Sequence, residues 1–159
     1  MKHAPSFMTL LASASLILGI LSSQALAADI MVVDAWSRAM PPTARVLPVY
    51  LTLHNHGDSQ VSLIKISSKL GAVALHNTVM ENDMMRMQAV DKIVVQAKQQ
   101  IKLAPMGLHA MVTGLTQAVP GEGDVLPLTL SFDNGEQMSI NALVRKVAMP
   151  EAADKHAHH

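Results

Sequence analysis

Short runs of alternating apolar and polar residues, separated by turn residues, most constrain the fold of this chain. Such runs cover residues 50–55 and 61–66. Alternation with a period of two is typical of strands that bury one face. The strongest hairpin signal is Asn134-Gly135, which separates alternating runs at residues 125–132 and 138–144. We therefore predict an all-β fold, an antiparallel sandwich or barrel.

Further apolar segments complete this pattern. Gly114 closes the last of them, and Pro127, inside a predicted strand, indicates an edge strand or a bulge. No internal repeat or second domain is evident. The further predicted strands lie at residues 30–36, 72–76, 93–95, 101–103 and 108–112.

The first 27 residues have the features of a secretory signal peptide. Lys2 precedes an apolar run at residues 7–21, and Ala25-Leu26-Ala27 forms an A-x-A cleavage site. The run is too short and too interrupted by serine to span a bilayer stably. We expect export to the periplasm, cleavage after residue 27, and no stable membrane insertion afterwards. The remaining chain would comprise one domain, residues 28–148, and a flexible tail, residues 149–159.

Composition excludes several classes of function. Without residues 1–27 the chain has 11 basic and 12 acidic side chains, a net charge of 11 − 12 = −1, which does not favour nucleic-acid binding. The sequence contains no cysteine, so we expect no disulfide and no lipid anchor. It also lacks a Ser/His/Asp order, paired carboxylates in an apolar setting and a Gly-rich phosphate loop, so we do not expect an enzyme.

Two segments, residues 76–87 and 107–111, concentrate histidine and methionine. Imidazole and thioether without thiolate form a soft, uncharged ligand set that suits Cu(I), whereas zinc prefers Cys, His and carboxylate and blue-copper sites need cysteine. Methionine is a common core filler, but the first segment is polar around its methionines, which indicates an exposed turn. The candidate ligands are His76, Met87, His109 and Met111, with Met80, Met84, Met85 and Met106 as auxiliary candidates.

Strand periodicity predicts how these side chains are arranged. A hairpin centred on Glu81-Asn82 would place His76 opposite Met87, with Cβ atoms about 5 Å apart. The period of two places Met80 on the face of His76, Met85 on the face of Met87, and His109 on the face of Met111. We expect the site to lie at the protein surface, rimmed by Met80, Met84 and Met85.

The spacing His76-x10-Met87-x21-His109-x-Met111 resembles the signature of the periplasmic copper chaperones that load the CuA centre of cytochrome c oxidase. Segments 34–38, 50–55 and 126–132 agree with this family. The resemblance implies a cupredoxin-like β-sandwich, a Cu(I) site made by the four residues, and delivery to an oxidase copper subunit or another copper protein. Two positions depart from the family: Asn77, where some members have methionine, and Met106, where Pro-Gly-Gly is usual.

Several alternatives stay open. The protein could instead store or detoxify periplasmic copper without a dedicated client. The tail resembles the Met/His-rich extensions of some family members, which bind Cu(II). A random polar tail or the remnant of a purification tag would have a similar sequence. His54 and His56 flank a turn, where we expect them to be solvent-exposed, with metal binding as the lesser alternative. The tail candidates are Met149, His156, His158 and His159.

Overall fold

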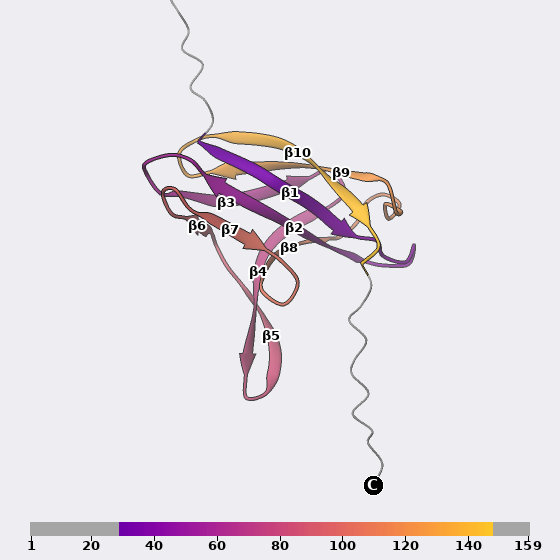
Figure 1. The fold of residues 1–159 in the computed structure, drawn as a ribbon. Helices are drawn as coiled ribbons and strands as arrows, with labels where there is room; N and C mark the ends of the chain where they lie inside the picture. Colours follow the sequence, from indigo (N-terminus) through magenta and orange to yellow (C-terminus); the bar gives the residue numbers. More distant parts are fainter. Residues whose placement is uncertain (1–28, 148–159) are drawn as a thin grey trace, which may run out of the picture.

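The computed structural model describes residues 29–147, which form ten β-strands and no helix (Figure 1). The predicted all-β fold is confirmed. No helix among residues 29–147 is long and apolar enough to cross a membrane. The predicted signal peptide and the tail candidates Met149, His156, His158 and His159 lie outside the described residues. The strands are β1 Ile30–Arg38, β2 Val46–Asn55, β3 Val61–Ser68, β4 Ala72–Glu81, β5 Met84–Ala89, β6 Ile93–Val95, β7 Gln100–Leu103, β8 Leu108–Thr113, β9 Val125–Phe132 and β10 Gln137–Arg145.

All ten strands belong to one curled sheet. Its order is β5-β4-β8-β2-β1-β10-β9-β3-β6, and β7 pairs with β2 beside β8. Strands from distant places in this order contribute to one apolar core: Leu53 and Val112 pack with Leu63 and Leu130, and none of the four exposes measurable surface. One strand pair departs from the predicted antiparallel arrangement, because β1 runs parallel to β10.

Strand β2 shows how alternation positions the core and the outer face. Leu47, Val49, Leu51 and Leu53 are at most 1% exposed. Successive side chains of a strand alternate, so the residues in between point to the other face of the sheet. These residues are Pro48, Tyr50, Thr52 and His54. That outer face carries the candidate site.

The turn at Asn134-Gly135 forms the predicted hairpin between β9 and β10. The Gly135 N–H donates to the Phe132 carbonyl at 3.1 Å, and Gly135 has a positive φ of 86°. This geometry is that of a three-residue loop whose last residue is left-handed, where glycine has no steric cost. The prediction of an edge strand around Pro127 is wrong, since β9 lies between β10 and β3. Pro127 directly precedes Leu128, where the pairing of β9 with β3 ends, so its missing N–H breaks no bond on that side.

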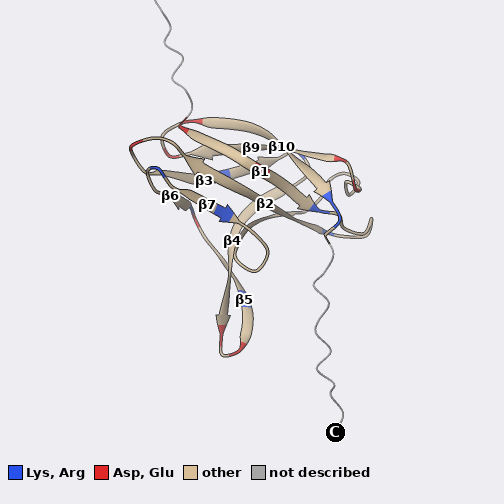
Figure 2. Ribbon diagram, viewed as in Figure 1, with Lys and Arg blue, Asp and Glu red and all other residues tan. Residues whose placement is uncertain are grey.

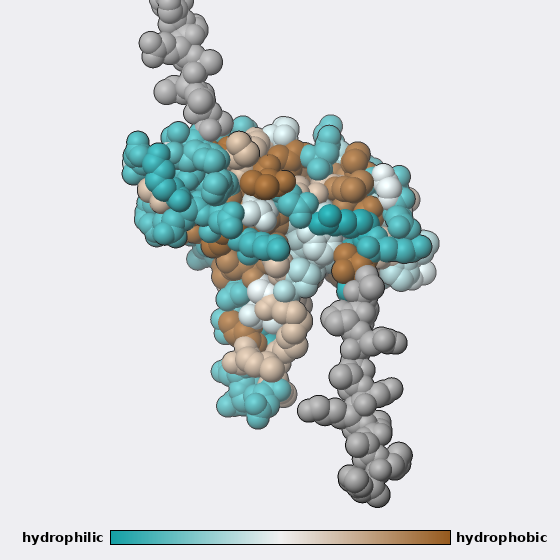
Figure 3. Space-filling view, in the orientation of Figure 1, coloured by the Kyte–Doolittle hydropathy of each residue, from teal (hydrophilic) through white to brown (hydrophobic). Residues whose placement is uncertain are grey.

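The β4–β5 hairpin projects from the body of the sandwich (Figure 1). Strand β5 pairs only with β4, and all six of its residues are exposed. Acidic residues mark the tip of this hairpin (Figure 2), and apolar side chains follow it as far as the hydrophilic tip (Figure 3). Gly71 precedes β4, and a Cβ at this position would collide with the Thr113 carbonyl at the end of β8. The absence of a side chain at Gly71 therefore lets β4 pack directly against β8.

Candidate metal centre

The turn between β4 and β5 sets which residues of the hairpin face one another. Asn82 and Asp83 have positive φ angles of 51° and 58°, and Glu81 pairs with Met84. A two-residue hairpin turn needs both central residues in the left-handed region, which Asn and Asp tolerate better than Glu. The centre of the hairpin is therefore one residue later than the sequence predicted.

The predicted pairing of His76 with Met87 is accordingly wrong. His76 is opposite Ala89, and Met87 is opposite Thr78. The shift moves each cross-strand partner by two residues, so it preserves the face on which each side chain lies. Met87 is thus a diagonal neighbour of His76 on the same face.

The remaining hairpin methionines divide between the two faces. Met80 pairs directly with Met85, on the face of His76 and Met87. Met84 pairs with Glu81 and belongs to the opposite face. The predicted rim of Met80, Met84 and Met85 is therefore wrong for Met84, which lies on the far side of the hairpin. Met80 and Met85 share the face of the site but do not line the hollow on it.

Strand β8 brings the second candidate segment beside the first. His109 pairs with His76, and Met111 pairs with Ala74. The two imidazole rings lie nearly parallel, with centroids 5.8 Å apart and planes inclined by 23°. All four candidate ligands consequently share one face of three neighbouring strands, β5, β4 and β8.

A surface hollow of about 310 Å³ lies on this face. Met87, His109 and Met111 line it together with Met106. Met40 also lines it, a residue that the sequence did not place because it follows β1 in a loop, without periodicity. His76 is not part of the lining and adjoins the hollow through its contact with His109. The other lining residues are Arg38, Val46, Pro48, Tyr50, Thr78 and Pro105.

His109 is held in one tautomer by the backbone. Its ring is buried, with 5% of the residue exposed, and Nδ1–H donates to the Gly107 carbonyl at 2.9 Å. Because a carbonyl can only accept, the proton must reside on Nδ1, and Nε2 keeps its lone pair. The same carbonyl also accepts the Thr78 N–H at 3.1 Å. His109 is therefore prepared to donate through Nε2 to a cation.

His76 has a buried ring nitrogen without a partner. Its Nδ1 makes no hydrogen bond within the described residues. A buried polar atom left unsatisfied destabilises a fold by about 1–3 kcal/mol. Coordination of a cation through this nitrogen, after a small ring movement, would remove that cost.

Two thioethers of the hollow are much more accessible than the His109 imidazole, while His76 and Met111 are both half-buried. Met87 is 60% exposed and Met106 is 70% exposed, whereas His109 is 5% exposed. The prediction of a surface site thus applies to Met87 and Met106, while His109 is buried. Such large exposed apolar side chains are unusual on a soluble protein unless they have a ligand or a partner. The other exposed methionines of the hairpin are Met80, Met84 and Met85.

No carboxylate lines the hollow, and its one charged side chain is Arg38. Burial raises the pKa of the Tyr50 phenol, and the nearby Arg38 charge acts in the opposite direction. Within residues 29–147, no three His, Cys, Asp or Glu residues are grouped so as to hold a metal ion. The available donors are therefore uncharged nitrogen and sulfur atoms, which suit a soft monovalent ion better than a hard divalent one.

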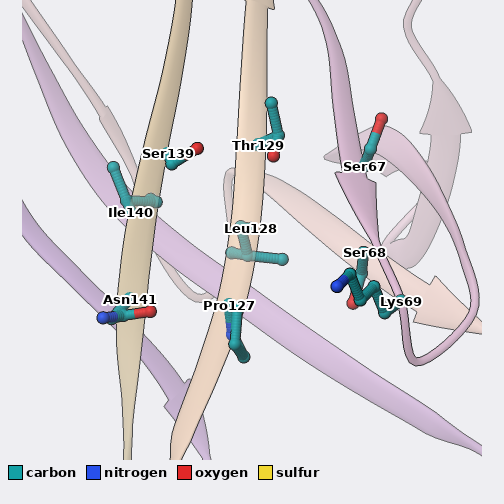
Figure 4. A pocket seen from close by; sticks show the side chains of 9 residues that line it. All are labelled: Ser67, Ser68, Lys69, Pro127, Leu128, Thr129, Ser139, Ile140 and Asn141. Carbon is teal, nitrogen blue, oxygen red and sulfur yellow. The ribbon is translucent and has the colours of Figure 1, made fainter.

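A second hollow lies on the outer surface of β3, β9 and β10 and measures about 500 Å³. Figure 4 shows its lining, which consists of hydroxyl, amide and apolar side chains with one lysine. It contains no histidine, methionine or carboxylate. Although this hollow is larger, it lacks the donors that metal binding needs, so the His/Met face is the candidate site.

Solved structures with the same fold include PCuAC domains and the protein DR1885. The apo PCuAC domain of PmoF1 is 22% identical, with a TM-score of 0.63, and the match covers 75% of this chain and 95% of that domain. Apo-DR1885 from Deinococcus radiodurans is 26% identical, with a TM-score of 0.59, over 92% of this chain and 97% of that one. The CuI form of DR1885 is also 26% identical, with a TM-score of 0.61, over 78% and 83% of the two chains.

The sequence family is defined by a separate comparison. The family model described as "Putative lipoprotein LpqE-like" matches residues 30–144, so the chain belongs to the LpqE-like family. No curated protein sequence matches the chain significantly.

Proposed function

We propose that this protein binds Cu(I) through His76, Met87, His109 and Met111 and delivers it to a client protein. The observation that carries the proposal is the pairing of His76 with His109 beside a thioether-lined hollow. His109 offers Nε2, and His76 has an unpartnered Nδ1. Two imidazoles and two thioethers form a neutral, soft donor set for which Cu(I) is the preferred ion.

The unequal exposure of the ligands supports transfer rather than permanent retention. His109 would hold the ion from the buried side, while Met87, at 60% exposure, would be the ligand that a client reaches first. Replacement of neutral thioethers one at a time leaves no uncompensated buried charge. Met106 and Met40 line the same hollow and would supply further sulfur atoms near the exit.

Three further expectations belong to this proposal. The client is an oxidase copper subunit with a CuA centre, or another copper protein. Export to the periplasm is supported by the signal-like residues 1–27 and by the lipoprotein name of the family. The copper-binding domain is residues 28–148, and the tail at residues 149–159 is a candidate Cu(II) site. The CuI form of DR1885, at 26% identity, supports Cu(I) as the cargo.

Competition titration with a Cu(I) chelator tests the site. Met87→Ala and His109→Ala should each weaken Cu(I) binding about tenfold or more. Loss of a group that only orients a metal ligand by a hydrogen bond already costs about that much, and these variants lose the ligand itself. Met84→Ala is the matched control, since Met84 lies on the same strand with 55% exposure but faces away. Thermal melts verify that the His109 variant is folded. Equal affinities in the wild type, Met87→Ala and Met84→Ala would overturn the site.

Copper storage is the second candidate function. The observation in its favour is the exposed Met80–Met85 pair, which continues the sulfur-bearing face beyond Met87. Storage predicts two or more Cu(I) ions per chain and a copper-sensitive deletion strain with normal oxidase activity. One Cu(I) per chain, with low oxidase activity and normal copper tolerance in the deletion strain, would select the chaperone.

A further inference from the structure

We propose a second metal site, formed by His54 and His56, that binds a divalent transition-metal ion such as Cu(II). The two rings meet at the end of β2, away from the candidate Cu(I) site. His54 Nδ1 lies 3.1 Å from His56 Nε2, and the ring centroids are 4.3 Å apart at an angle of 83°. Neither nitrogen pairs with a carboxylate or a backbone group among the described hydrogen bonds.

The separation of the two nitrogens matches chelation of one ion. Imidazole nitrogen binds zinc-like divalent ions at about 2.0–2.1 Å, so two such ligands lie about 2.9 Å apart at a right angle and about 3.3 Å apart at a tetrahedral angle. The observed 3.1 Å falls between these limits. In the metal-free protein one ring donates its N–H to the other, and a metal ion would take the place of that shared proton. Each neutral ring would then carry its proton on the opposite nitrogen.

The backbone between the two histidines is firmly held, so the pair is preorganised. Buried Asn55 donates through Nδ2 to the carbonyls of Ser59 and Val95, at 2.8 and 3.1 Å, and accepts the Gly57 N–H at 2.9 Å. The His56 N–H donates to the Asp29 carbonyl at 2.7 Å. A ligand pair fixed in this way loses little conformational entropy on binding, which favours chelation.

The surroundings can accept a cation. His56 is exposed and His54 is half-buried, so water can complete the coordination. The charged neighbours on this end include the Asp29 and Asp58 carboxylates and the Lys98 ammonium, which pairs with Asp58 at 2.9 Å and with the His56 carbonyl at 2.7 Å. Lys102 is opposite Thr52 on β7 and therefore lies on the face of His54, so two carboxylates and two ammonium groups surround the pair. Met31 is opposite His54 on β1 and is 52% exposed, which adds a thioether to the same face.

This site is distinct from the proposed Cu(I) site. Pro48 pairs with Met111, and His54 is six positions after Pro48 on β2. At about 3.3 Å per residue the two sites are roughly 20 Å apart along the strand. The imidazole pair suits the oxidised, divalent ion, whereas the His/Met face suits Cu(I). The second site therefore does not depend on the proposed chaperone function.

Nuclear magnetic resonance of the isotope-labelled full chain, titrated with sub-stoichiometric Cu(II), tests the proposal. Paramagnetic broadening should appear first at the amides of residues 53–57 and 100. His54→Gln and His56→Gln should each abolish this early broadening, since a single imidazole loses the chelate effect. Gln100→Ala is the matched control, because Gln100 is the β7 neighbour of His54 and has no imidazole.

Two outcomes would overturn the site: early broadening confined to His76, His109 or the tail, or broadening at residues 53–57 that persists in both glutamine variants. Cu(I) competition on the same variants separates the two proposals. Wild-type Cu(I) affinity in His54→Gln is expected if the sites are independent. A tenfold loss of Cu(I) affinity in that variant would show that the two histidines belong to the first site, and the independent second site would be rejected.

Discussion

Met106 has a backbone conformation that methionine rarely adopts. Its φ is 69°, in the left-handed region, and it stands between Pro105 and Gly107 in the turn before β8. A side chain in this region is strained, because its Cβ crowds the backbone. In this strained conformation, the exposed thioether of Met106 lines the hollow. Substitutions of Met106 can therefore change the stability of the fold and the affinity for copper separately.

Met106→Gly should therefore stabilise the fold and weaken copper binding. Relief of about 1–2 kcal/mol of left-handed strain, less about 0.5–1 kcal/mol for the entropy that glycine gains in the unfolded chain, should add about 0.5–1 kcal/mol to the free energy of unfolding. Cu(I) affinity should fall, because one nearby sulfur is lost. Urea denaturation of the apo protein and Cu(I) competition measure the two effects. Met106→Leu keeps the strain and removes the sulfur, so it should lose affinity without gaining stability; unchanged affinity in both variants would remove Met106 from the site.

For individual residues, the sequence predicted which side chains lie close together but not which groups hold each side chain in place. Clustering of histidine and methionine in a polar segment was enough to select His76, Met87, His109 and Met111. Met40 could not be selected, because a loop has no periodicity from which a position in space follows. The sequence also could not predict the hydrogen-bond partner of His109. The partner is the backbone carbonyl of Gly107, and every residue has such a carbonyl whatever its side chain.

The β4–β5 hairpin is the element that carries Met87, and it has little tertiary support. All residues of β5 are exposed, and β5 has a single neighbouring strand. The Arg86–Glu81 ion pair, at 3.4 Å, joins two half-exposed side chains and contributes little. Few buried contacts imply a low free energy of local opening. The turn residues Asn82 and Asp83 are therefore important for the population of the closed hairpin.

Asp83→Gly should make the hairpin more persistent. Asp83 has a φ of 58°, which glycine adopts without steric cost, and Asn-Gly is the preferred pair for this turn. We expect hydrogen exchange of the β5 amides to slow severalfold, corresponding to about 0.5–1 kcal/mol. Asp83→Ala keeps the side-chain strain without the carboxylate, so its exchange should not slow. Equal protection in both variants would mean that the turn conformation does not limit hairpin opening.

For this element the sequence predicted the faces correctly and the register incorrectly. The period of two determines which residues share a face, and a two-residue shift preserves it, so Met80, Met85 and Met87 remain with His76. The exact pairing depends on which two residues take the turn. Asn82-Asp83 and Glu81-Asn82 both look like polar turns in sequence, and only the left-handed requirement distinguishes them.

At the scale of the whole molecule, contacts between distant segments join the two halves of the sheet. Parallel pairing of β1 with β10 joins Trp36 to Leu143, and the sequence could not predict it because local alternation says nothing about distant partners. A second long-range contact joins the β9–β10 loop to β3. The Ser62 N–H donates to the Asp133 carboxylate at 2.8 Å, and this bond lowers the pKa of Asp133.

Stability should consequently fall in acid through Asp133. A carboxyl whose folded-state pKa lies below its ordinary value of 3.8 stabilises the fold above that pH and loses this contribution as pH falls through the folded pKa. Asp133→Asn should thus be less stable than the wild type at neutral pH, and the difference should shrink below about pH 3.8. Urea denaturation across pH measures it. Asn134→Ala, in the same loop, is the neutral control, and a difference for Asp133→Asn that is constant with pH would contradict the prediction.

The main-chain oxygen of Gly107 has a consequence for how this protein can vary. It orients the His109 ring and also receives the N–H of Thr78 from the projecting hairpin. Because the acceptor belongs to the backbone, no exchange of a side chain can delete it. Substitution can remove this hydrogen bond to His109 only by changing the course of the main chain between Ala104 and Leu108. The orientation of the buried ligand is therefore protected from side-chain substitution at Gly107, whereas the exposed thioethers around it remain free to change.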